Sequence, residues 1–265
     1  MKRQACKRLL TAAVLCAALT VPTRAVRRSV PVQIDGNPIA VSAYVERGVT
    51  YVPLRALLNT MGAWDVWWDE ATGRAAAASD DTHLWADPAA DTVTVDEKTV
   101  RGRVTVENGV TYVPLRLVGE ALGCQVEWDP YLRGATVTSP GAAYDAGELY
   151  WLSRIIRAES GAESMSGQIA VGNVILNRVR SSSFPNTVEG VIFDRKDAVQ
   201  FEPVSNGRVY LPPTSQSVEA AKRALDGENV IGSALYFYAP ALSQGTWINA
   251  NCTYQQTIGC HRFYR

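Results

Sequence analysis

A glutamate on an apolar helix face is the residue of this sequence best suited to acid chemistry. Glu159 follows Ile155 by four residues and Ile156 by three, so it extends an apolar stripe on a helix predicted to end near Ser160. Desolvation and the negative end of the helix dipole would both raise the pKa of Glu159. A carboxylic acid that keeps its proton near neutral pH can donate it to a leaving oxygen, as breaking a glycosidic bond requires. On helical phase alone, the alternative is a surface glutamate or one paired with Arg178.

Two helices and a break between them must position this glutamate. The first helix is expected to stop at Ser160-Gly161, and Ser164 or Ser166 can cap the second. The second helix is apolar nearly all round, which is typical of a central helix. Its Asn177 either fixes a neighbouring loop or makes an ordinary structural hydrogen bond. The back half of the chain is therefore predicted to be mainly helical.

The composition indicates an exported globular protein of two domains. The chain has 265 residues, of which 47% are hydrophobic and 20% charged. Residues 1–25 form a predicted leader, with a basic start, an apolar run over 9–21 and a small-x-small cleavage site. The run is short for a membrane span, although an uncut leader acting as an anchor is the alternative. Removing the five basic residues of the leader leaves 21 basic and 26 acidic side chains, a net charge of −5, which argues against nucleic acid or an anionic membrane as main partner.

The cysteines and the missing motifs limit the chemistry further. Cys252 and Cys260 lie eight residues apart in a polar tail, so a disulfide between them is predicted for an oxidising compartment. The chain has two histidines and lacks His-Glu-x-x-His, Cys-x-x-Cys and Gly-x-x-x-x-Gly-Lys. No metal and no cofactor are therefore expected.

An internal duplication organises the front half. The octapeptide Gly-Val-Thr-Tyr-Val-Pro-Leu-Arg occurs at 48–55 and again at 109–116, an offset of 61 residues. Each copy is predicted to form a strand pair, a helix opened by proline and a further strand. The pattern indicates one α+β domain with internal pseudo-symmetry over residues 30–138. The composition of 139–147 is typical of a linker, which leaves residues 148–265 as the second domain.

The duplicated half resembles the copper amine oxidase N-terminal-like domain of exported Gram-positive proteins, on the octapeptide and on the repeated Trp-Asp at 68–69 and 128–129. Copper is not expected, because this half offers one histidine, His83, and one cysteine, Cys124. We interpret the domain as a stalk or wall-associating module. Trp67 and Trp68 face opposite ways on a strand, so one could be exposed and stack on a sugar ring, although most tryptophans here are expected in the core.

The back half resembles the SleB-type cell wall hydrolases, the spore-cortex-lytic catalytic domain. The resemblance runs from about Tyr150 to the C-terminus, through Ala158-Glu159, Glu163, 167–171, 174–179, 183–187, Gln200-Phe201, 234–237, Trp247 and 258–263. It implies a mainly helical, lysozyme-like fold with a long cleft. It also implies lytic transglycosylase activity on the glycan strands of peptidoglycan.

By this resemblance, Glu159 is the catalytic acid. It would protonate the oxygen between N-acetylmuramic acid and N-acetylglucosamine, and then accept a proton from the C6 hydroxyl of the same sugar as a 1,6-anhydro ring closes. One carboxylate suffices because the nucleophile is intramolecular, whereas hydrolysis usually needs a second carboxylate. Glu163 is a poor second carboxylate: on a continuing helix it would raise the pKa of Glu159 by repulsion, and after a break its direction is open. The alternatives are a muramidase that uses water and a non-catalytic wall-binding protein.

Further residues of the back half are candidates for binding or support. Hydrogen bonds to sugars or stacking on them are expected of Gln200, Phe201, Tyr236, Tyr238 and Trp247, each with a core or turn position as the alternative. Glu163, Asn177 and His261 are candidates for supporting roles. We expect a secreted protein associated with the cell wall or the spore. Whether it acts on vegetative wall or spore cortex, and which protein partner it has, stay open.

Overall fold

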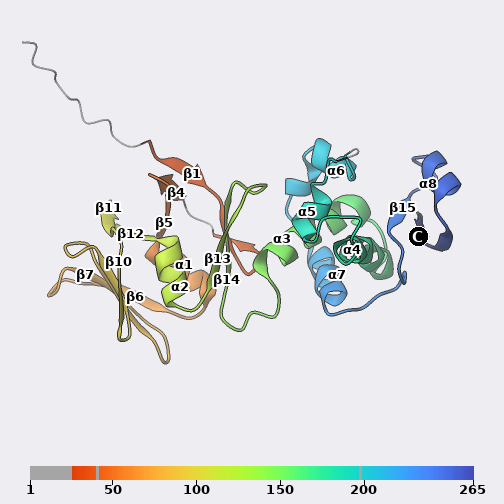
Figure 1. Ribbon diagram of the computed structural model, residues 1–265. Helices are drawn as coiled ribbons and strands as arrows, with labels where there is room; N and C mark the ends of the chain where they lie inside the picture. The colour runs from red at the N-terminus through yellow and green to blue at the C-terminus, as the bar shows by residue number, and fades with distance from the viewer. Residues whose placement is uncertain (1–25, 40–41, 197–198) are drawn as a thin grey trace, which may run out of the picture.

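The computed structural model describes residues 26–39, 42–196 and 199–265, so the predicted leader lies outside the described residues. Figure 1 shows a strand-rich front half, a group of helices beside it, and a small terminal unit with the C-terminus at the far end. The mixed α+β class is confirmed, with the longest helices in the back half. In the described ranges, no helix is both long and apolar enough to span a membrane.

The front half consists of strands and two short helices. In chain order these are β1 (Arg28–Val30), β2 (Val32–Ile34), β3 (Asn37–Pro38), β4 (Ala43–Glu46), β5 (Val49–Pro53), α1 (Leu54–Met61), β6 (Asp65–Asp69), β7 (Arg74–Ala78), β8 (His83–Asp87), β9 (Thr92–Val95), β10 (Lys98–Arg101), β11 (Thr105–Glu107), β12 (Val110–Pro114), α2 (Leu115–Ala121), β13 (Gln125–Asp129) and β14 (Gly134–Thr138). They form three sheets, with the orders β1-β4-β5-β12-β11, β10-β9-β8-β7-β6 and β13-β14-β2-β3.

The two sequence copies meet at an internal pseudo-twofold axis. Strand β5 pairs antiparallel with β12, and Val52 lies opposite Val113. These valines are equivalent residues of the two copies, so the axis passes between them. Each copy then contributes one helix directly after its proline, Pro53 before α1 and Pro114 before α2, as predicted. The duplication therefore produces one symmetric unit.

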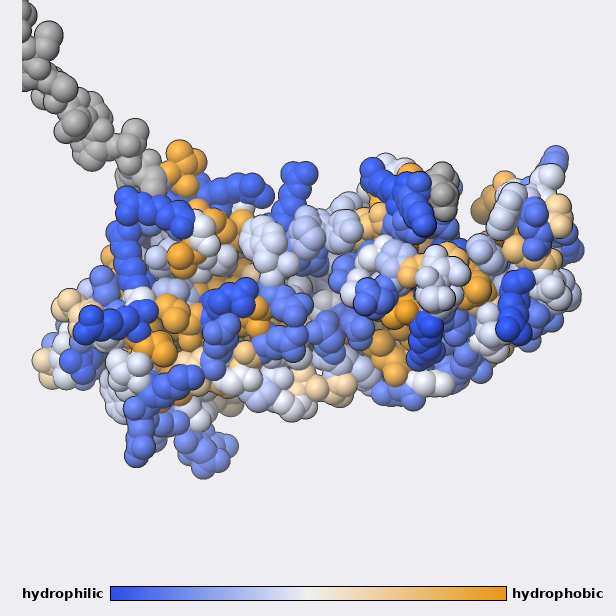
Figure 2. Space-filling model, in the orientation of Figure 1, coloured by the Kyte–Doolittle hydropathy of each residue, from blue (hydrophilic) through white to orange (hydrophobic). Residues whose placement is uncertain are grey.

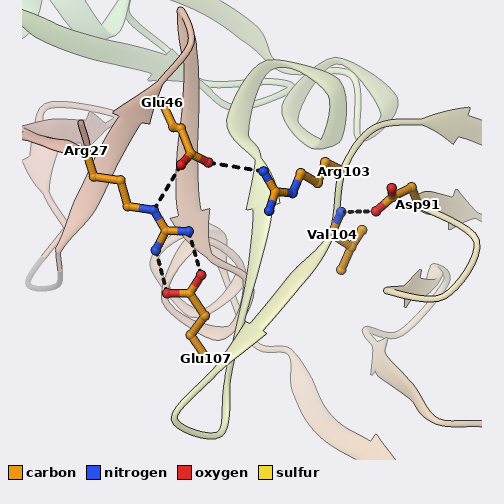
Figure 3. Close-up of polar contacts among 6 residues, drawn as sticks. All are labelled: Arg27, Glu46, Asp91, Arg103, Val104 and Glu107. Carbon is orange, nitrogen blue, oxygen red and sulfur yellow. Dashed lines mark hydrogen bonds and ion pairs between the residues drawn. The ribbon is translucent and has the colours of Figure 1, made fainter. Parts of the chain in front are cut away.

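A charged cluster ties the hairpins of the two copies together (Figure 3). Arg27 donates to both carboxylate oxygens of Glu107, at 2.5 and 2.6 Å, and its Nε lies 3.5 Å from Glu46. Glu46 also accepts a hydrogen bond from Arg103 at 3.3 Å. Glu46 and Glu107 are equivalent residues, 61 apart. Because a guanidinium that grips both oxygens of a carboxylate is geometrically specific, the cluster helps to hold β4–β5 against β11–β12.

The back half is built around three mutually packed helices, α3, α4 and α7. Its elements are α3 (Ala146–Ser160), α4 (Met165–Val179), α5 (Val188–Ile192), α6 (Glu202–Ser205), the 3₁₀ helix η1 (Arg208–Tyr210), α7 (Ser215–Leu225), β15 (Tyr236–Tyr238), α8 (Thr246–Asn251), β16 (Tyr254–Ile258) and β17 (His261–Tyr264). Helix α4 is buried along most of its length, as its composition predicts. Asp145 caps α3, and Ser164 caps α4 as expected.

The front half packs directly on helix α3. Asp129, at the end of β13, accepts a hydrogen bond at 2.5 Å from the indole of Trp151, which is fully buried. Tyr131 stacks on Phe193 of the back half, with ring centroids 4.1 Å apart. Helix α3 begins at Ala146, so the end of the predicted linker belongs to a helix. The hairpin β13–β14 therefore braces α3 from its side.

Candidate active site

Glu159 lies half-buried in the last turn of α3, on the apolar face that the sequence predicts. Ile155 and Ile156 on this helix are fully buried. Desolvation by burial raises the pKa of Glu159 to about 7; Arg208 lowers it and Glu202 raises it further. A large fraction of this side chain therefore keeps its proton at neutral pH and can donate it.

Arg208 and Glu202, which the sequence interpretation does not single out, supply the charges around Glu159. Arg208 in η1 donates from Nη2 to the backbone carbonyl of Ala158 at 2.7 Å, which brings its guanidinium to the end of α3. That carbonyl belongs to the final helical turn, where intrahelical donors run out. Glu202 is the first residue of α6. It follows the Gln200-Phe201 pair directly, so this motif could have drawn attention to it, whereas no local pattern marks Arg208.

The break after α3 leads Glu163 to a different partner. Its Oε1 accepts a hydrogen bond from the Cys260 thiol at 2.7 Å. The pKa of Glu159 responds to Glu202 and Arg208, with no contribution from Glu163. The repulsion expected of Glu163 on a continuing helix therefore does not arise, because α3 ends at Ser160 and α4 starts anew at Met165.

Glu163, Cys260 and His261 form a compact donor set. One ligand atom of each lies within 4.8 Å of the others. Burial lowers the pKa of His261, which favours the neutral imidazole that binds metals. Carboxylate, thiolate and imidazole are the donors zinc uses, and three protein ligands leave a fourth position open. These residues could hold a divalent ion, a possibility hidden in the sequence because Glu163 and Cys260 are 97 residues apart.

The predicted disulfide between Cys252 and Cys260 is wrong for this structure. Both cysteines are free thiols. Cys252 directly follows α8, whereas Cys260 occupies the turn between β16 and β17 and donates to Glu163. The spacing of the two cysteines could not predict the hydrogen bond between Cys260 and Glu163, because these residues are 97 positions apart in the chain.

Thiol labelling tests this correction. Unreduced native protein from residue 26 onward should take up two maleimide labels, at Cys260 and Cys252, while the buried Cys124 reacts only after unfolding. The hydrogen bond to Glu163 raises the pKa of Cys260, so Glu163→Gln should speed its labelling several-fold at pH 7. The rate at Cys252 serves as the internal control. If the native protein took up no label and the unfolded protein took up one, the predicted disulfide would be present after all.

Three of the predicted sugar-binding residues lie at or near the surface. Trp247 on α8 is 59% exposed, and the half-buried Tyr236 lies edge-on to it with centroids 5.6 Å apart. Gln200 is half-buried and accepts a hydrogen bond from Arg178 at 3.2 Å. Arg178 also donates to the Leu235 carbonyl, so it is engaged in the back-half core rather than with Glu159.

Phe201 and Tyr238 have structural positions, which is the alternative that the sequence also allows for them. Phe201 is 2% exposed and lies against Phe237 in the core. The buried Tyr238 exchanges hydrogen bonds with Asn249, and its ring stacks on Tyr264. Hydrophobic packing explains both, since each aromatic ring gains more from burial than from exposure at a wet cleft.

The two other support candidates act on the loop and sheet beside α4. Asn177 donates from Nδ2 to the carbonyls of Gly232 and Ala234, at 2.8 and 2.9 Å. It therefore fixes the neighbouring loop, one of the two roles expected for it. His261 is buried in β17 edge-on to Phe237, at 5.2 Å between centroids.

The raised pKa makes Glu159 a source of pH-dependent stability. Between the ordinary value of 4.5 and about 7, the folded protein holds a proton that the unfolded chain has lost. The free energy of unfolding therefore falls as pH rises through this window. Glu159→Gln removes the effect, so the variant should match wild type at pH 4 and exceed it by about 1–3 kcal/mol at pH 8. Urea unfolding at both pH values measures this; equal differences at the two values would contradict it.

Comparison with known proteins gives two family matches. Residues 162–264 match the Cell Wall Hydrolase model, and residues 33–137 match the Copper amine oxidase N-terminal domain. The first match starts just after Glu159, so it does not itself test the role of that residue.

The relatives of the back half carry related names. A spore cortex-lytic enzyme of Bacillus cereus is 37% identical over 119 residues, which are 45% of this chain and 44% of that protein. A second, from Bacillus subtilis (strain 168), is 34% identical over 109 residues, 41% of this chain and 34% of that protein. This chain thus spans less than half the length of these curated relatives.

Solved structures extend the comparison. The catalytic domain of the germination-specific lytic transglycosylase SleB from Bacillus anthracis is 36% identical, with a TM-score of 0.43, and the match covers 48% of this chain and 99% of that one. The catalytic domain of the Bacillus cereus SleB protein is also 36% identical, with a TM-score of 0.42, covering 48% and 94%. The chain thus combines a region similar to the cell wall hydrolases, residues 162–264, with a region in front of it, residues 33–137, that is similar to the copper amine oxidase N-terminal domain.

Proposed function

We propose that this protein cleaves peptidoglycan glycan strands between N-acetylmuramic acid and N-acetylglucosamine by a lytic transglycosylase mechanism. The carrying observation is Glu159, whose pKa of about 7 suits an acid that donates and then recovers a proton. The match of residues 162–264 to the Cell Wall Hydrolase family supports the substrate class. The names of the spore cortex-lytic relatives support a location in the cell wall or spore.

In this mechanism one carboxyl group serves both steps. Glu159 donates its proton to the glycosidic oxygen as the bond from that oxygen to C1 of the muramic residue breaks. The resulting carboxylate accepts the proton of the C6 hydroxyl while O6 bonds to C1, so the acid is regenerated. Arg208 stabilises the carboxylate between the two steps, since its positive charge lowers the pKa of Glu159. The intramolecular hydroxyl removes the need for a bound water.

Hydrolysis by water is the second candidate, and Glu202 is the observation that favours it. Its charge acts on Glu159, so the described structure does offer a second carboxylate near the acid. In a hydrolase this residue would activate water or stabilise the cationic sugar. Hydrolysis is the weaker of the two candidates because Glu202, at the start of α6, is exposed. Solvent screens the charge of an exposed carboxylate well.

Product analysis separates the two. Purified sacculi digested in ¹⁸O-labelled water should release muropeptides that end in 1,6-anhydromuramic acid, lighter by one water than reducing ends and free of the label. Glu202→Gln should retain most activity and the same products. Reducing ends carrying ¹⁸O, lost in Glu202→Gln, would instead establish hydrolysis.

The chain organisation is part of the proposal. We assign residues 1–25 to a leader, 30–138 to a wall-associating module, 139–147 to the junction and 148–265 to the hydrolase domain, with export to the wall or spore. Parallel digestion of spore cortex and vegetative sacculi decides between the two polymers. Preference for cortex would match the named activity of the relatives.

A further inference from the structure

The front half contains two grooves that the internal duplication makes equivalent. Groove A, with a volume of about 990 Å³, lies between α1, strands β6–β7 and the hairpin β11–β12. Groove B, of about 380 Å³, lies between α2, strands β13–β14 and the start of β5. Each groove therefore takes its helix and strand pair from one sequence copy and its hairpin from the other. Both volumes fall in the range of small-ligand sites.

The lining residues match one for one. Arg55 in groove A corresponds to Arg116 in groove B, at the offset of 61, and Trp68 corresponds to Trp128, at an offset of 60 after a one-residue slip. Two cavities of the same construction on opposite sides of a pseudo-twofold axis are unlike the irregular hollows of an ordinary surface. The duplication has preserved a groove as well as a fold.

Each groove exposes an indole at the equivalent place, and Trp67, 46% exposed, also lines groove A. Trp68 is 38% and Trp128 47% exposed, although large aromatic side chains gain most from burial. In the face shown in Figure 2, apolar surface is visible over the front half, around the region of α1 and α2, and also over the helices of the back half. Contiguous exposed apolar surface with a polar rim is typical of a binding site.

The charged residues that line the grooves limit the chemical class of the ligand. Groove A carries Arg55 and Glu70, and groove B carries Arg116 with Glu120 and Glu127, so neither presents an excess of positive charge. A polyanion or an anionic membrane is disfavoured, and the acidic balance of the chain after residue 25 disfavours them further. A sugar ring fits: it has an apolar C–H face for the indole, and hydroxyl and amide groups for the rim. The arginine at the same place in both grooves complements the carboxylates that muramic residues carry through their lactyl and peptide groups. Arg116 lies 3.3 Å from Glu120 in an exposed ion pair, which is weak enough for a ligand carboxylate to replace.

We propose that grooves A and B are two binding sites for peptidoglycan glycan strands, with Trp68 and Trp128 each stacking on a sugar ring. The choice of this polymer rests on the proposed function. Two equivalent sites suit a ligand that repeats the same unit, because simultaneous engagement raises the affinity for the strand well above that of either site.

Groove B also adjoins the hydrolase domain. Strand β13 supplies Trp128 to this groove, and the turn between β13 and β14 packs Tyr131 on Phe193, beside α3. A strand held in groove B is thus bound to an element in direct contact with the helix that carries Glu159. The front half retains the enzyme on its insoluble substrate while cutting proceeds.

Binding is tested in a Glu159→Gln background, which prevents cleavage, by co-sedimentation with purified sacculi and by titration with glycan strands freed of stem peptides. Trp68→Ala and Trp128→Ala should each weaken binding about tenfold, and the double variant about 100-fold. Trp85→Ala is the matched control, because Trp85 is 37% exposed on β8 but lines neither groove. It should bind as the background protein does.

Tyrosine variants separate stacking from folding. Trp68→Tyr and Trp128→Tyr keep an aromatic face and should bind within about threefold of the background protein. Two results would overturn the proposal: alanine variants that bind as well as Trp85→Ala, or loss confined to one groove. Cleavage of sacculi by the otherwise unaltered chain is scored separately. Cleavage without groove-dependent binding refutes this inference alone, and binding without cleavage refutes the proposed function alone.

Discussion

Glu159→Gln will abolish glycan cleavage and leave the fold intact. Glutamine keeps the shape of the side chain but has no proton to donate, so the rate of release of soluble muropeptides should fall by about 10³–10⁴-fold. Far-UV circular dichroism and thermal unfolding at pH 4 should match wild type, because the wild-type side chain is largely protonated there in both the folded and the unfolded protein.

Glu148→Gln is the matched control for that loss. Glu148 lies in the first turn of the same helix, is half-buried, and has its pKa raised by burial as well. It lies near the opposite end of α3, so its replacement should change the cleavage rate by less than about threefold. Cleavage by Glu159→Gln at the rate of Glu148→Gln would contradict the assignment of the acid.

Trp151→Ala will cause the largest loss of stability among the replacements considered. Trp151 is fully buried, donates to Asp129 across the two halves, and lies edge-on to Phe193 at 4.8 Å. Truncation leaves a cavity and removes the donor from Asp129, so the free energy of unfolding should fall by about 3–5 kcal/mol. Urea denaturation followed by circular dichroism measures the change.

Trp151→Phe divides this effect into its parts. It keeps a six-membered aromatic ring but loses the hydrogen bond and part of the buried volume, so the expected loss is about 1–3 kcal/mol. The exposed Trp85→Ala should change stability by about 0.5 kcal/mol or less. A loss below 1 kcal/mol for Trp151→Ala would mean that the front half does not brace α3.

Local patterns were enough to predict the helix of Glu159. Its apolar periodicity, the stop near Ser160 and the cap at Ser164 are all properties of neighbouring residues, and the structure shows each of them. The repeated octapeptide likewise predicted two equivalent strand–helix units, because the same local sequence folds in the same way twice. Periodicity and repetition depend on short-range structure, and the predictions made from them were confirmed for short-range features.

Contacts between distant segments could not be predicted in this way. Arg208 reaches the end of α3 from 50 residues further along the chain. Cys260 meets Glu163 across the whole hydrolase domain, which removed the expected disulfide. The Pro-Gly-Ala-Ala composition of 140–143 suggested a spacer, yet the turn after β13 packs on the back half just before it. Such pairings depend on the tertiary arrangement, which a single sequence does not display.

The carboxyl group of Glu159 can be observed directly. Carbon-13 NMR of protein labelled at the glutamate δ-carbon, with the resonance assigned by its absence in Glu159→Gln, gives the pKa of this one group by pH titration. We expect a midpoint of about 7 and a cleavage rate that declines as pH rises through the same midpoint. A midpoint near 4.5 would show a carboxylate already ionised at neutral pH, and it would contradict the role of Glu159 as the proton donor.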